Sequence, residues 1–135
     1  MQYETTIDFK MVNGTSLRGY ITATYDELVA AFGQPSNGDN YKVQAEWAIL
    51  LTDEDEKQYV ATIYDWKCGD CYNGPGNGIP AEAITSWNVG GHTSYVLELL
   101  ERVLFDTREM LANEEENRMY QWDFEWEQSE RSSLN

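Results

Sequence analysis

Two runs of alternating side chains constrain the fold of this chain more than any other feature. In residues 41–51, YKVQAEWAILL, apolar side chains such as Trp47 and Ile49 occupy every second position. The run at 58–66, QYVATIYDW, repeats this alternation after the acidic segment 52–57, TDEDEK. A period of two is typical of a strand with one buried face. The two runs therefore predict an antiparallel hairpin with an acidic tip.

Further segments extend this hairpin into a sheet. Residues 3–10 and 16–22 are rich in β-branched and aromatic side chains, and the turn dipeptide Asn13-Gly14 lies between them. This arrangement predicts a second hairpin. Residues 83–91, AITSWNVGG, predict one more strand.

Two segments have the spacing of amphipathic helices. In 24–33, Thr24 and Glu27 form the pattern of a capping box, and Gly33 predicts the end of the helix. From about residue 93 onward, apolar side chains recur at helical spacing; they are Val96, Leu97, Leu100, Val103, Leu104 and Leu111. We therefore expect an α+β fold: an antiparallel sheet of four or five strands, a short helix at about 24–33, and a long C-terminal helix from about 93 packed on one face.

A chain of 135 residues has the size of one domain with one core. We expect a single α+β domain over 1–113 and an acidic, aromatic, partly helical C-terminal extension over 114–135. Met119, Trp122 and Trp126 follow at helical spacing. Either the long helix continues into the extension, or a second helix follows a break near 113–117.

The charge of the chain indicates what it can bind. There are 24 acidic and 9 basic residues, which give a formal charge of −15, and residues 91–135 alone carry 11 acidic and 4 basic residues. Phosphates would be repelled, so the charge argues against direct binding to nucleic acid or to an anionic membrane and favours a basic partner. No apolar run has the roughly 18 residues of a membrane span, and the N-terminal residues lack a secretory pattern, so we expect a cytoplasmic protein.

The segment 63–80 carries the most chemistry-like motif. Cys68 and Cys71 have the spacing of a redox dithiol, but glycine, asparagine and proline follow, which predicts that no helix starts there. A zinc site would need these two thiols, His92 and an aspartate, an unusual ligand set. The glycine-rich run lacks the lysine and the helix of a phosphate-binding loop. We favour an exposed turn between strands, with a small metal- or ligand-binding domain as an alternative.

No residue of this sequence can be assigned a catalytic role from its pattern. Asp65 and Glu46 lie on adjacent predicted strands and are the nearest to an acid/base pair, but among 24 acidic residues some pair arises by chance. We interpret both as part of a solvated sheet face. No serine or cysteine motif places a nucleophile beside His92. The sequence predicts neither an enzyme nor a cofactor.

The acidic aromatic end is the strongest candidate for a binding surface. Residues 106–130 carry nine acidic residues and two arginines. On a helix, carboxylates three or four residues apart stand about 5–6 Å from one another, comparable to the phosphates of a nucleic-acid strand. We predict these contact residues: Glu114, Glu115, Glu116, Trp122, Asp123, Glu125, Trp126 and Glu127, with Asp53, Glu54, Asp55 and Glu56 as a secondary patch. The alternative is that Trp122 and Trp126 cover the end of the core while the acidic residues keep the chain soluble.

The motifs GYITATYDELVAAFG, YKVQAEW, ATIYDWK and WNVGG resemble a group of small accessory proteins of tailed bacteriophages, over roughly residues 14–100. The group has no established activity, so the resemblance implies a context and no catalytic residue: a phage protein acting in the cytoplasm of an infected bacterium. We predict a non-enzymatic protein that binds and inhibits a basic host protein, a nucleic-acid-binding defence or repair factor, by mimicking DNA. A homodimer or larger homo-oligomer with a structural role is an alternative.

Overall fold

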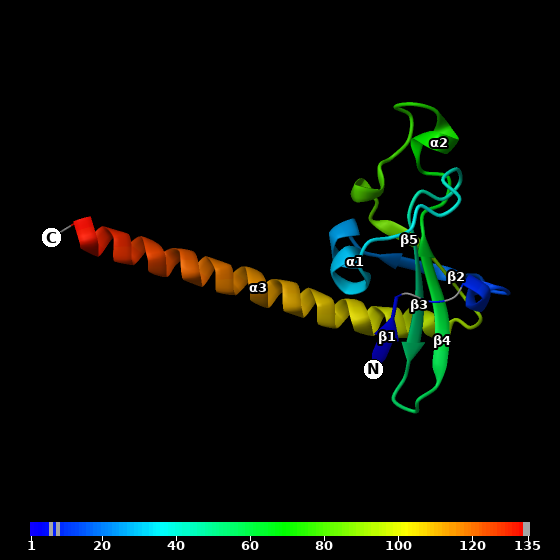
Figure 1. Cartoon of the computed structure of the whole chain (residues 1–135), viewed down its shortest axis with the longest axis horizontal. Helices are drawn as coiled ribbons and strands as arrows, with labels where there is room; N and C mark the ends of the chain where they lie inside the picture. Colours follow the sequence, from blue (N-terminus) through cyan, green and yellow to red (C-terminus); the bar gives the residue numbers. More distant parts are fainter. Residues whose placement is uncertain (6, 8, 134–135) are drawn as a thin grey trace.

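The computed structural model describes residues 1–5, 7 and 9–133, with side chains up to Gln121 except that of Phe9. It confirms the α+β fold (Figure 1). All strands pair antiparallel in one sheet of order β1-β3-β4-β5-β2. The strands are β1 (Gln2–Glu4), β2 (Ser16–Thr22), β3 (Glu46–Thr52), β4 (Gln58–Tyr64) and β5 (Ser86–Gly91). The helices are α1 (Tyr25–Phe32), α2 (Asp70–Asn73) and α3 (Tyr95–Ser133), with 3-10 turns η1 (Phe9–Val12) and η2 (Ala81–Ala83).

The predicted hairpin at the centre of the sheet is confirmed, since β3 and β4 pair along their whole length. However, β3 begins at Glu46 and not at residue 41. Two carboxylates bind the backbone of 41–45 instead. Asp39 Oδ1 accepts hydrogen bonds from two N–H groups of this segment, and Asp65 Oδ1 accepts two more, at 2.8–3.1 Å. Because these donors are taken, the alternating pattern before Glu46 forms no ladder.

The predicted N-terminal hairpin is wrong. β1 pairs with β3, and β2 pairs with β5, while η1 occupies much of the connection between them. The dipeptide Asn13-Gly14 does form a turn, with Gly14 at a φ of +82°. The pairing of β2 with β5 places Ile21 opposite Trp87, and both side chains are buried. Long-range burial of apolar surface therefore decides the partner of β2 over the local turn signal.

The short helix is confirmed in detail. Thr24 Oγ1 accepts a hydrogen bond from the N–H of Glu27, and the Glu27 carboxylate accepts one from the N–H of Thr24, which completes the capping box. Gly33, at a φ of +82°, ends α1. The Gly33 carbonyl accepts a hydrogen bond of 2.7 Å from Trp47 Nε1. This contact joins the end of α1 to the sheet.

The long helix packs on the same face of the sheet as α1 (Figure 1). Trp47 and Trp87 meet edge to face in this core, with ring centroids 5.3 Å apart. The helix contributes a stripe of fully or nearly fully buried side chains: Val96, Leu99, Leu100, Val103 and Leu104. α3 then continues to Ser133 without a break, which decides between the two predicted alternatives. At 1.5 Å per residue its 39 residues span about 58 Å.

Candidate functional site

The second half of α3 leaves the body of the protein. Among the helix side chains that the structure describes, up to Gln121, Thr107 is the last buried one and Leu111 the last half-buried one. Every side chain from Ala112 to Gln121 is exposed. Figure 1 shows this part of the helix running away from the sheet. We call residues 112–133 the α3 extension.

The α3 extension presents charge and apolar surface together. The predicted contact residues Glu114, Glu115 and Glu116 are all exposed. One turn further on, Met119 is 65% exposed and Tyr120 is 72% exposed. Large apolar side chains next to charges are what protein interfaces use as anchors. The backbone of the other predicted contact residues is helical, but their side chains lie outside the described residues, and they remain predictions; they are Trp122, Asp123, Glu125, Trp126 and Glu127.

The secondary patch lies at the tip between β3 and β4, as predicted. The Asp53 carboxylate accepts hydrogen bonds of 2.9 Å from the N–H groups of Asp55 and Lys57, so this residue shapes the turn. Glu56 has a φ of +65°, in the left-handed region. Glu54, Asp55 and Glu56 are exposed. Three of the four predicted carboxylates are therefore available to a partner, and the fourth is structural.

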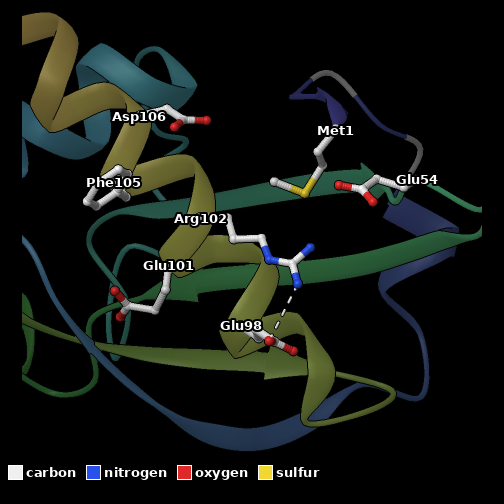
Figure 2. A pocket seen from close by; sticks show the side chains of 7 residues that line it. All are labelled: Met1, Glu54, Glu98, Glu101, Arg102, Phe105 and Asp106. Atoms are coloured by element: carbon white, nitrogen blue, oxygen red, sulfur yellow. Dashed lines mark hydrogen bonds and ion pairs between the residues drawn. The ribbon is translucent and has the colours of Figure 1, made fainter.

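The sheet places this tip beside the outer face of α3. Together they line an open groove with a volume of about 480 Å³ (Figure 2). We call it the acidic groove. Phe105 and Met1 provide its apolar surface, being 61% and 43% exposed. Arg102 is the one cationic side chain among the described lining residues, and it forms an ion pair with Glu98 with an N–O distance of 3.5 Å. The carboxylates of the groove belong to Glu54, Glu98, Glu101 and Asp106.

The sequence predicted only part of the lining of the acidic groove. Glu54 was predicted as a contact residue, but the five α3 residues that line the groove with it were missed. Glu98, Glu101 and Phe105 are spaced i, i+3 and i+7, so they form one helix face away from the buried stripe. That spacing is a signal, but only the folded sheet brings the hairpin tip to it. Glu114 lies eight residues beyond Asp106, about 12 Å along the helix axis.

A single ion pair marks the point where α3 leaves the body. Arg108 Nε contacts the Glu27 carboxylate at 2.7 Å, and its Nη2 donates to the Thr22 carbonyl at 2.7 Å. Burial alone raises the pKa of Glu27, but hydrogen bonds from Arg108 and Thr24 and the charge of Arg108 outweigh it and lower the pKa overall. Arg108 is therefore held by the body while the next turns of α3 are not.

The cysteine motif differs from the prediction in one respect. A one-turn helix, α2, does begin at Asp70, and Cys71 is part of it. The Gly69 carbonyl accepts hydrogen bonds from the N–H groups of Tyr72 and Asn73, which closes this turn. The Asp70 carboxylate accepts hydrogen bonds from the N–H groups of Gly76 and Gly78, at 3.1 and 2.8 Å. The glycine-rich run therefore wraps around this carboxylate. Cys68 and Cys71 are both free thiols.

The candidate zinc ligands do not come together. Cys68 Sγ contacts the Trp66 carbonyl at 3.4 Å, and Cys71 Sγ lies 4.0 Å from Asn40 Oδ1. His92 Nε2 lies 3.4 Å from the Met11 carbonyl. Among the side chains that the structure describes, which end at Gln121, no group of three from His, Cys, Asp or Glu could hold a metal ion.

The interpretation of Asp65 as part of a solvated face is wrong. Asp65 is 2% exposed, and its Oδ1 atom binds the backbone N–H groups of Gln44 and Ala45. Its side chain therefore fixes the segment before β3. Glu46, the other half of the considered pair, is half-buried on the opposite face of the sheet.

Comparison with protein-family models, with curated proteins and with solved structures found no match to this chain. In the part of the chain that the structure describes, no helix combines the length and apolar character needed to cross a membrane.

Proposed function

We propose that this chain is a non-enzymatic phage accessory protein that binds a basic host protein through the α3 extension and the acidic groove. The phage context rests on the resemblance of its sequence motifs, and with it goes a location in the cytoplasm of the infected bacterium. The partner class is a nucleic-acid-binding defence or repair factor. The chain inhibits this factor by occupying the groove that would otherwise hold DNA or RNA.

One observation carries this proposal: ten consecutive exposed side chains, 112–121, on a helix that has left the body. Isolated helices in water are marginal, and an exposed helix gains little from packing. Met119 and Tyr120 are exposed beside Glu114–Glu116. Exposed apolar side chains next to carboxylates are typical of a helix that contacts a partner. The carboxylates steer a basic partner, and the apolar side chains anchor it.

Self-association through the α3 extension is the competing function, and the exposed Met110, Met119 and Tyr120 favour it. Charge weighs against it. Residues 106–130 carry nine acidic residues against two arginines, so pairing two such helices brings like charges together. A basic partner gains from the same charges. Light scattering on the purified chain separates the two, because a monomer at micromolar concentration excludes the homo-oligomer.

The test is capture of partners from bacterial lysate by the immobilised chain, at about 50 mM and about 500 mM salt. We compare wild type with the triple variant Glu114→Gln, Glu115→Gln, Glu116→Gln. The control triple variant is Glu4→Gln, Asp26→Asn, Glu82→Gln, which removes the same charge from exposed positions on the body.

We expect a basic protein to be captured at low salt and released at high salt. The extension variant should bind it about tenfold more weakly, while the control variant changes the affinity less than twofold. Duplex DNA should compete with the chain for the purified partner. Equal losses in both variants would mean that net charge alone drives the capture, and salt-insensitive binding would contradict the proposed electrostatic contact.

A further inference from the structure

A second pocket lies on the face of the sheet opposite to α3. Ile63 and Trp47 point into the core, so their neighbours in the strands, Thr62, Tyr64 and Glu46, project from the other face. Val12 and residues 15–17 border part of that face and line one side of an open pocket of about 260 Å³. Neither the α3 extension nor the acidic groove contributes to it.

Glu46 is the one charged side chain among the described residues that line this pocket. Its carboxylate is half-buried and has no hydrogen-bond or ion-pair partner in the described part of the chain. Burial raises its pKa, and the negative charge of Asp39 raises it further. A carboxylate in this position is stabilised by a ligand that brings a positive charge.

Two aromatic rings stand beside this carboxylate. Tyr64 is the cross-strand neighbour of Glu46, and the Tyr64 and Trp66 rings lie 6.5 Å apart at 80°. Trp66 is 47% exposed. The ammonium groups of Lys42 and Lys67 lie 5.8 and 5.6 Å from its centroid, so a ligand cation would share this ring with two lysines, and Glu46 has to supply the attraction. Rings at right angles next to a carboxylate are suited to an organic cation.

We propose that this pocket binds a small organic cation of the alkylammonium class, with its charge at Glu46 and its alkyl groups against Tyr64 and Trp66. An anion would meet Glu46 and a chain of charge −15. A neutral ligand would leave the half-buried carboxylate without a counterion. The pocket is small, which fits a free ion better than a headgroup anchored in a membrane. This site is independent of the proposed function.

The test compares choline with 3,3-dimethyl-1-butanol, a neutral alcohol of the same shape, on the wild-type chain. Binding is followed by chemical-shift changes of backbone amides in NMR titrations. We expect choline to bind about tenfold more tightly than the alcohol, with the changes centred on residues 46, 62, 64 and 66. Equal binding of the alcohol, or no binding of choline, would overturn the proposal. Tighter binding of phosphatidylcholine vesicles than of choline would also overturn it.

Two matched variants test whether Glu46 recognises the positive charge of choline. Glu46→Gln should weaken choline binding about tenfold, and Glu82→Gln, an exposed carboxylate outside the pocket, should change it less than twofold. Circular dichroism checks that both variants are folded. Equal weakening by both variants would mean that the overall field of the chain attracts choline, which contradicts a built site. The wild-type comparison of choline with the alcohol needs no variant and stands if Glu46→Gln fails to fold.

Discussion

The two halves of α3 share one continuous helix but have opposite surroundings. Residues 95–111 supply a stripe of side chains to the core, whereas every side chain from 112 to 121 is in contact with solvent. Starting a helix is costly and extending it is not, so the packed half provides the nucleus from which the exposed half continues. The core explains the first half completely. The second half needs a different explanation, and the binding partner that we propose would supply one.

The largest effect expected from this comparison is on stability. Leu100 is fully buried, so Leu100→Ala should lower the free energy of unfolding by about 3 kcal/mol, through lost burial and the cavity that remains. The matched change in the exposed half, Met119→Ala, should lower it by less than about 0.5 kcal/mol. Urea denaturation of both variants measures this. Similar losses in the two would mean that the α3 extension packs against the body.

The architecture was predictable where the deciding contacts are local or strongly periodic. The capping box of Thr24 and Glu27 involves residues three apart, and its sequence pattern predicted α1 correctly. The alternation on both sides of the acidic tip predicted β3 and β4 in the same way. The buried spacing from Val96 to Leu104 predicted the packed half of α3.

The failures are long-range. The Asn13-Gly14 turn signal is real, but the partner of β2 is β5, some 70 residues away along the chain, as the pairing of Ser16 with Gly91 illustrates. In the sequence, Asp65 is an ordinary carboxylate at the end of a strand. Only the folded chain brings the backbone of residues 44–45 to it. The acidic groove likewise depends on contact between a hairpin tip and a helix. No local pattern contains these pairings.

A smaller effect is expected at the junction of the two halves. The folded-state pKa of Glu27 is lowered from its ordinary value of 4.5, so its charge stabilises the fold above that pH, and this contribution is lost as pH falls through the lowered pKa. Glu27→Gln keeps a capping side chain but removes the charge that pairs with Arg108. We expect the free energy of unfolding of wild type to exceed that of this variant by less than about 1 kcal/mol at pH 7. This difference should shrink below about pH 4.5.

Thermal unfolding of wild type and Glu27→Gln across pH 3 to 7 measures this gap. A gap that stays constant over this range, or that widens toward low pH, would contradict an ion pair between Glu27 and Arg108 as the last anchor of α3.

Hydrogen exchange over residues 112–121 tests the central claim most directly, with and without the basic partner captured from lysate. In the free chain these amides should exchange faster than those of 95–111, because no side chain here is buried. Binding should slow their exchange and leave 95–111 unchanged. If they are already as protected as 95–111 in the monomer, or if the partner binds without slowing them, the α3 extension is not the docking surface.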